Sequence, residues 1–114
     1  MAYVPLALTM GDPAGIGGEL SVKAWLARRG GHPFVALDDP DRLAGIAVGL
    51  GLDVPVRAVN SLEQGAGAFA DALPVWPVRL GAPVVAGRPG PANAAAVAES
   101  IERATRFALA GEAA

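Results

Sequence analysis

Residues 4–18 read VPLALTMGDPAGIGG, and this stretch decides the fold. Its first half, Val4 to Met10, is a short apolar run without polar alternation, which is typical of a strand buried on both faces of a parallel sheet. Its second half is a glycine-rich loop that leads into a predicted helix at Glu19–Arg29. A strand, a glycine-rich turn and a helix in this order predict the opening of a layered α/β domain.

The rest of the chain repeats this alternation. Strands are predicted at Pro33–Leu37, Asp53–Val59 and Leu73–Leu80, and helices at Asp41–Leu50 and Ala92–Ala110. Residues 60–71 and 81–91 contain glycine or proline and are expected to be irregular or loop. Pro74 and Pro77 cannot donate to a ladder, so their strand is placed at the edge of the sheet. The predicted fold class is α/β, a layered domain with a largely parallel sheet.

Helical spacing predicts which side chains face the core. The first helix should bury one stripe with Trp25 beside it: Leu20, Ala24 and Ala27. The last helix should bury a second stripe: Val97, Ile101, Ala104 and Ala108. Two pairs in the last helix have the i,i+4 spacing of ion pairs: Glu99 with Arg103, and Glu102 with Arg106.

Composition excludes several classes of protein. Of 114 residues, 53% are hydrophobic and 18% charged, which argues against an intrinsically disordered chain. The net charge of −2 gives no electrostatic reason to expect nucleic acid or an anionic membrane as a partner. The chain has no cysteine, so it has neither a disulfide framework nor a thiolate zinc site, and a cytoplasmic location fits. No segment reaches the roughly 18–20 apolar residues of a membrane span.

The glycine-rich loop is the candidate ligand site. Gly11, Gly15, Gly17 and Gly18 follow the first strand, and parallel α/β sheets bind ligands beyond the carboxyl ends of their strands. Glycine lets a ligand approach the backbone, and the N–H groups at a helix N-terminus attract anions. The spacing matches neither G-x-G-x-x-G nor a Walker A loop. A tight turn without a ligand therefore explains the glycines equally well.

The order of residues is more specific than their spacing. Residues 8–17, LTMGDPAGIG, resemble the opening motif of the 4-hydroxythreonine-4-phosphate dehydrogenase family of pyridoxine (vitamin B6) biosynthesis. Residues 93–106, read as N-x-A-A-V-x-x-S-I-E-x-A-T-R, are similar to the asparagine-led helix of that family. Residues 82–90, with Ala-Pro-Val and then Gly-x-Pro-Gly, are similar to its link into this helix. The chain departs from the pattern at Gly18, usually proline, and at Ala94, usually glycine.

This resemblance implies a two-lobed fold like that of the isocitrate and isopropylmalate dehydrogenases, with two subunits completing each active site. It implies an oxidoreductase that acts on a small phosphorylated hydroxy acid, with NAD or NADP as cofactor and a divalent metal that assists oxidation and decarboxylation. Gly11, Asp12, Gly15 and Gly17 would lie on the cofactor side of the cleft. Asp12 could instead cap the helix or hold the turn. Dihydrodiol and sugar-acid phosphate dehydrogenases are similar to this family, so a related substrate stays open.

The resemblance also implies that the chain is incomplete. Residues 1–114 would be the N-terminal part of the first α/β lobe, with the remainder of that lobe and the whole second lobe absent. No catalytic or metal-binding residue is then expected within the chain, and the chain alone should be inactive. The alternative is a complete, non-catalytic α/β nucleotide-binding or regulatory module.

The remaining candidate residues have simpler interpretations. His32, the single histidine, follows two glycines and should be an exposed turn residue. Asp38, Asp39 and Asp41 could bind a hard cation, but a helix cap before Pro40 explains them better. Trp25 and Trp76 are expected in the core or an interface. Ser61 and Ser100 have no base near them in sequence, so a serine hydrolase has no support.

Overall fold

Strands and helices alternate along the chain as predicted. The computed structural model describes residues 4–84, 87 and 91–114. Its elements in chain order are β1 (Leu6–Thr9), α1 (Gly17–Arg28), β2 (Phe34–Asp38), α2 (Pro40–Gly49), β3 (Val56–Ala58), α3 (Leu62–Ala68), β4 (Leu73–Pro77), the 3₁₀ turn η1 (Pro91–Asn93) and α4 (Ala94–Leu109). Residues 85–86 and 88–90 of the expected loop lie outside the described residues.

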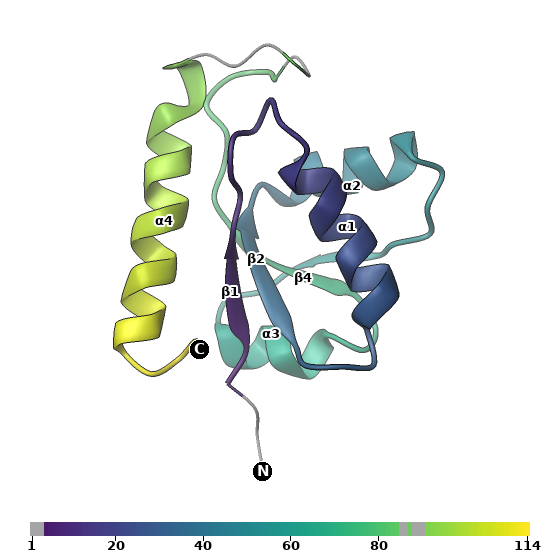
Figure 1. The fold of residues 1–114 in the computed structure, drawn as a ribbon, viewed down its shortest axis with the longest axis vertical. Coiled ribbons are helices and arrows are strands. Elements are labelled where there is room, and N and C mark those ends of the chain that lie inside the picture. The colour runs from purple at the N-terminus through teal and green to yellow at the C-terminus, as the bar shows by residue number, and fades with distance from the viewer. Residues whose placement is uncertain (1–3, 85–86, 88–90) are drawn as a thin grey trace.

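The sheet within the described residues has four strands in the order β1-β2-β4-β3, and every pairing is parallel. One face is covered by α1 and α2, whose Val22, Trp25 and Leu43 pack on Phe34 and Leu73. The other face is covered by α3 and α4, as Figure 1 shows for α4 alongside β1. The predicted layered α/β fold with a parallel sheet is confirmed.

The prediction that β4 lies at the edge of the sheet is wrong, because β4 lies between β2 and β3. The N–H of Leu73 donates to the carbonyl of Pro55, so the nitrogen of the next residue, Pro74, points toward β2. The β2 ladder begins only at Val75, and the β3 ladder ends at the same residue, before Pro77. Each proline therefore lies where the ladder requires no N–H donor.

Residues 60–71, predicted to be irregular, contain the helix α3. Ser61 caps α3 by accepting a hydrogen bond from the N–H of Gln64 at 3.0 Å. The Gln64 side chain accepts in return from the N–H of Asn60 at 2.8 Å. Gly65 is buried where α3 packs against the sheet beside Val35. A glycine is therefore needed at position 65 because α3 packs closely on the sheet, and not because the backbone must be flexible there.

The buried faces of two helices differ from the predicted stripes. Ala24 packs against the core as predicted, but Leu20 is 55% exposed and Ala27 is also exposed. The buried residues of α1 are Gly18, Ser21, Val22 and Trp25. The Trp25 indole N–H donates to the carbonyl of Phe69 at 2.7 Å, which fixes this side of α1 inward. Trp25 is thus a core residue, as predicted.

The predicted face of the last helix is confirmed only in part. Val97 and Ala104 pack against the core as predicted, but Ile101 is 53% exposed and Ala108 is exposed. The fully buried residues of this helix are Ala96 and Ser100. The Ser100 hydroxyl donates to the carbonyl of Leu37 at 2.7 Å and accepts from the N–H of Met10 at 3.1 Å. These two bonds hold the Ser100 side of α4 against the strands, a constraint that apolar periodicity does not register. No helix in the described part of the chain could cross a membrane.

The two predicted ion pairs of α4 have different outcomes. Arg106 pairs with Glu102 at 2.7 Å, as predicted. Arg103 does not pair with Glu99 and instead lies over the Trp76 ring, 5.4 Å from its centroid. Trp76 is half-buried and also packs edge-on against Phe107, so it too belongs to the core.

Candidate functional site

The carboxyl ends of the parallel strands gather several loops at one edge of the sheet. Residues 10–16 follow β1, residue 39 follows β2 and residues 78–84 follow β4. Figure 1 shows the turn between β1 and α1 and the segment that leads toward α4 at the same end of the molecule. The structure therefore places the predicted glycine-rich loop where parallel α/β sheets bind ligands.

The loop holds its shape through its own backbone. Gly11 has a φ of +64°, a conformation that favours glycine. The Asp12 carboxylate accepts from the N–H of Ala14 at 2.9 Å, and the Asp12 carbonyl accepts from the N–H of Gly15 at 2.9 Å. A side chain at Gly17 would place its Cβ 3.0 Å from the carbonyl of Met10. Gly11, Gly15 and Gly17 thus have turn-forming roles whether or not a ligand binds.

Asp12 stabilises the turn and does not cap α1. The N-cap position of α1 is Ile16, and among the described residues no side chain caps the first N–H groups of the helix. The caps of α2 and α3 do receive such bonds, from Asp39 and Ser61. The exposed loop therefore ends at a helix N-terminus whose N–H groups receive no side-chain cap, which favours an anion.

A buried ion pair supports the loop from beneath. Arg42 Nη1 lies 2.7 Å from Asp38 Oδ2 and 2.9 Å from Oδ1, and both side chains are more than nine-tenths buried. Arg42 Nη2 donates to the carbonyl of Pro13 at 3.1 Å. The guanidinium lies against Gly18, where an added Cβ would come within 3.0 Å of both Nη atoms. Gly18, the departure from the family pattern, thus leaves room for Arg42.

Burial raises the pKa of Asp38, while the Arg42 cation and the N–H of Asp39 act in the opposite direction. The prediction that Asp38 caps the helix is wrong, because Asp39 is the cap and Asp38 pairs with Arg42 instead. Their i,i+4 spacing was the available signal, but this spacing is common on exposed helices, and burial of the pair depends on the tertiary fold.

The cap interpretation is confirmed for Asp39, whereas Asp41 lies in the first turn of α2. Asp39 caps α2 by accepting from the N–H of Asp41 at 3.0 Å. Arg79 lies 3.2 Å from Asp39 and 3.1 Å from Asp41, and Asp39 also accepts from the N–H of Leu80. No group of three His, Cys, Asp or Glu residues among those described is arranged to hold a metal ion.

Further hydrogen bonds connect the loops to one another. The Asn93 side chain bonds both the N–H and the carbonyl of Ala82, at 3.0 and 3.1 Å. The N–H of Gly87 donates to the carbonyl of Ala14 at 2.9 Å. The segment resembling the family's link is thus tied to the glycine-rich loop. Together with the Arg42–Pro13 contact, these bonds make the carboxyl edge a connected set of loops.

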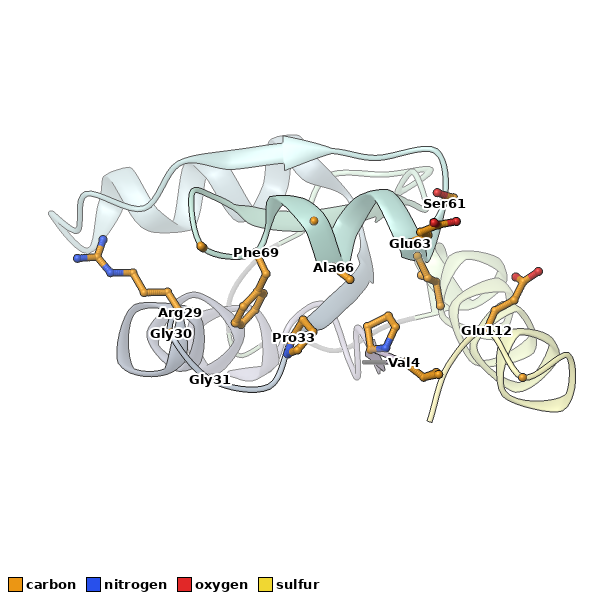
Figure 2. A pocket seen from close by; sticks show the side chains of 15 residues that line it. Val4, Arg29, Gly30, Gly31, Pro33, Ser61, Glu63, Ala66, Phe69 and Glu112 are labelled. Carbon is orange, nitrogen blue, oxygen red and sulfur yellow. The ribbon is translucent and has the colours of Figure 1, made fainter. Parts of the chain in front are cut away.

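The larger of two cavities lies at the opposite edge of the sheet from the glycine-rich loop. A cavity of about 850 Å³ opens between the start of β1, the end of α1 and α3, at the amino edge of the sheet. Figure 2 shows Phe69 and Pro33 along it, with Arg29 at one end and Glu63 and Glu112 at the other. A smaller hollow of about 490 Å³ lies beside Asp39 and Arg42. Because the loops and the uncapped helix converge at the carboxyl edge, that edge remains the candidate site.

The other sequence candidates lie away from this edge or have structural roles. His32 is exposed in a turn, as predicted, and its Nε2 lies 3.0 Å from the carbonyl of Val4. Ser61 is a helix cap and Ser100 is a buried residue whose hydroxyl bonds the backbone of Leu37 and Met10. Within the part of the chain that the structure describes, the partners of both hydroxyls are backbone groups.

No protein-family model matches the chain. Curated relatives do match it. The 4-hydroxythreonine-4-phosphate dehydrogenase of Methylorubrum extorquens (strain PA1) is 46% identical over 113 residues, which cover 96% of this chain and 32% of that protein. The enzyme of that name from Caulobacter vibrioides is 44% identical over 112 residues, covering 97% of this chain and 32% of the relative.

A solved structure agrees with these relatives. The chain superposes with a TM-score of 0.80 on the 4-hydroxythreonine-4-phosphate dehydrogenase from Klebsiella pneumoniae, at 25% identity, over 98% of this chain and 35% of that one. The chain thus spans about a third of the length of the proteins it matches. By sequence and by fold, it is related to the 4-hydroxythreonine-4-phosphate dehydrogenase family.

Proposed function

We propose that this chain forms part of an NAD(P)- and divalent-metal-dependent dehydrogenase that oxidises, and decarboxylates, 4-phosphohydroxy-L-threonine or a closely related hydroxy acid in pyridoxine biosynthesis. The observation that carries the proposal is the 46% identity over 113 residues to a dehydrogenase of that name. Residues 1–114 would form the N-terminal part of the first lobe of a two-lobed, homodimeric, cytoplasmic enzyme. The remainder of that lobe and the second lobe would come from further polypeptide.

The chain's own contribution would be the cofactor side of the cleft. When bound, the cofactor would supply a hydride acceptor and the divalent metal would supply Lewis-acid assistance. Gly11, Gly15 and Gly17 would let the cofactor approach the backbone, and Asp12 would accept hydrogen bonds from a ribose. The uncapped start of α1 offers N–H groups to an anionic portion of the cofactor. The proposal places the metal ligands outside this chain.

The first experiment measures the encoded protein. The intact mass is compared with the open reading frame, and the longer polypeptide is assayed for reduction of NAD or NADP with substrate and a divalent metal. We expect activity in the longer polypeptide and none in residues 1–114. A reading frame that stops after Ala114 would instead support the non-catalytic module, and activity of residues 1–114 alone would overturn the proposed division of the active site.

The second experiment separates the two roles of Asp12. Asp12→Asn keeps an oxygen for the N–H of Ala14 but removes the charge, whereas Asp12→Ala removes both. We expect Asp12→Asn to raise the KM for the cofactor by about tenfold or more while leaving Tm unchanged. An unchanged KM in Asp12→Asn, with a lower Tm only in Asp12→Ala, would leave Asp12 with its turn role alone.

A further inference from the structure

The glycine-rich loop at residues 11–16 is anchored at one buried residue. Pro13 is buried, whereas Asp12 and Gly15, on either side of it, are exposed. Arg42 Nη2 donates to the carbonyl of Pro13 at 3.1 Å, and among the described residues this side-chain hydrogen bond reaches the loop from a different element, α2. The proline ring fixes φ at this position, so a held carbonyl restricts the peptide groups on both sides. The position of the loop therefore depends on Arg42.

Pro13 lies inside the turn that orients Asp12. The Asp12 carboxylate accepts from the N–H of Ala14 at 2.9 Å, which encloses Pro13 in an Asx turn. The Asp12 carbonyl accepts from the N–H of Gly15 at 2.9 Å and closes the turn. A shift of the Pro13 carbonyl would rotate this turn and with it the Asp12 carboxylate. Arg42, 29 positions further along the chain than Pro13, thus acts on the direction of Asp12.

The Arg42 guanidinium is itself held at the centre of the sheet. Its Nη1 contacts both oxygens of the Asp38 carboxylate, at 2.9 and 2.7 Å, which leaves Nη2 to reach Pro13. Asp38 also accepts from the N–H of Asp39 at 2.7 Å. Asp38 ends β2, which is buried along its length and lies between β1 and β4. Side chains held in this way by packing and further hydrogen bonds keep a binding site in one geometry.

Gly18 supplies the space that the guanidinium occupies. It is buried in the first turn of α1. A Cβ there would lie 3.0 Å from both Nη atoms of Arg42 and 2.6 Å from Cδ1 of Ile46. Cδ1 is the end of a side chain and can rotate away, but the guanidinium is fixed by Asp38. A side chain at position 18 would therefore displace Arg42 from Pro13.

We propose that Arg42 is a positioning residue of the candidate cofactor site, acting on Asp12 through Pro13, and that Gly18 is required for this action. The ligand of the site, NAD or NADP, rests on the proposed function, whereas the coupling of Arg42 to the loop rests on the contacts above. Loss of this coupling should weaken cofactor binding and leave the chemical step nearly unchanged, because it acts on Asp12 and the proposed metal ligands lie outside this chain.

Arg42→Lys separates the ion pair from the loop contact. Lysine keeps a cation for Asp38, but its single nitrogen cannot replace two guanidinium nitrogens with separate partners. In the polypeptide that the reading frame encodes, we expect the amides of Ala14 and Gly15 to exchange hydrogen at least about tenfold faster in this variant, measured by NMR. The amide of Met10, which bonds Ser100, should keep its rate. Equal acceleration at all three amides, or none at any, would overturn the proposal.

Gly18→Ala tests the same contact from the other side. We expect it to accelerate exchange at the same two loop amides, and to add little once Arg42→Lys has removed the Nη atoms that the new Cβ would meet. Both measurements use an Ile46→Val background, which removes the Cδ1 atom from the comparison. Gly45→Ala on α2, where nothing lies within 4 Å of an added Cβ, is the control and should leave the loop unchanged. Additive effects of Gly18→Ala and Arg42→Lys would contradict the coupling.

Steady-state kinetics of the encoded polypeptide connects the loop to the cofactor. Arg42→Lys should raise the KM for NAD or NADP by about tenfold and lower kcat by less than about threefold. A loss of kcat at constant KM, or no change in either constant, overturns the positioning role and keeps the proposed function. Loop amides that respond to Arg42→Lys in a polypeptide without dehydrogenase activity overturn the proposed function and keep the coupling of Arg42 to the loop.

Discussion

Arg42 joins three parts of the chain that are distant in sequence. Its guanidinium pairs with Asp38 at the end of β2, donates to the carbonyl of Pro13 in the glycine-rich loop, and lies against Gly18 at the start of α1. Its side chain is only 9% exposed. Removing one member of a buried ion pair leaves an uncompensated buried charge, so single substitutions at this pair are more disruptive than at an exposed pair.

We expect Arg42→Gln to lower the free energy of unfolding by about 3 kcal/mol, because it leaves Asp38 buried without its cation. Arg79→Gln is the matched control. Arg79 also contacts two aspartates, but its side chain is 58% exposed, and exposed pairs contribute about 0–1 kcal/mol. Urea unfolding measures both variants. Equal effects would show that the Asp38–Arg42 pair does not stabilise the fold.

The pH dependence of stability should also depend on Asp38. Burial raises the pKa of this carboxyl above its ordinary 3.8, so the folded state holds the proton more tightly than the unfolded state. The contribution of Asp38 to stability is therefore fully present below pH 3.8 and is lost as the pH rises through the folded-state pKa. Arg42→Gln removes a cation that lowers this pKa, so stability should fall more steeply with rising pH in that variant. Urea unfolding between about pH 4 and about pH 7 measures the slope. A shallower slope in Arg42→Gln than in the unsubstituted chain would contradict this sign.

At the scale of elements, α3 shows how packing overrides helix propensity. Two glycines lie within seven residues of helix, a composition that favours a loop. The Ser61 cap and the Gln64 side chain begin the helix, and Gly65 brings its backbone close to β2 and β4. Gly67, two residues later, is exposed and has no atom near its missing Cβ.

The two glycines should respond oppositely to alanine. A Cβ at Gly65 would collide with Cγ2 of Val35 and lie 3.3 Å from Cβ of Pro74, neither of which can move away easily. We expect Gly65→Ala to destabilise the fold by about 1–3 kcal/mol through overpacking. Gly67→Ala should instead stabilise it by about 0.5–1 kcal/mol through helix propensity. Thermal unfolding followed by circular dichroism measures both, and a stabilising Gly65→Ala would show that α3 is not packed as described.

At the scale of the whole molecule, the described chain is unevenly covered. The inner strands β2 and β4 are packed between helices, and β2 is buried along its full length. β1 in contrast has an open edge and two exposed leucines. An open strand edge beside apolar side chains favours association with another strand.

Residues 1–114 alone should therefore self-associate through the edge of β1. Replacing Leu6 and Leu8 with lysine adds charge beside that edge and should shift the population toward monomer. Val48→Lys on α2, where the side chain is 81% exposed, adds the same charge elsewhere and should have little effect. Sedimentation velocity measures the populations. A monomeric unsubstituted chain, or an equal shift from Val48→Lys, would contradict this role for β1.

The strands, most helices and the position of the glycine-rich loop could be predicted because they depend on local signals. Apolar runs mark β1 and β2, Asp39 and Pro40 mark the start of α2, and the LTMGDPAGIG motif marks the family resemblance. The central position of β4, the face of α4 held by Ser100 and the helix at residues 62–68 could not be predicted in this way. Each depends on a partner far away in sequence: the two flanking ladders, the Leu37 and Met10 backbones, and the Val35 side chain.

The sequence by itself determined that the chain is a layered α/β fold with a glycine-rich turn after its first strand, because strand and helix periods and turn residues act over a few neighbouring positions. Only the tertiary structure decided that Arg42 supports that turn and that β4 lies between β2 and β3. Burial of an ion pair and the order of strands in a sheet are set by long-range packing, and spacing along the chain does not encode them.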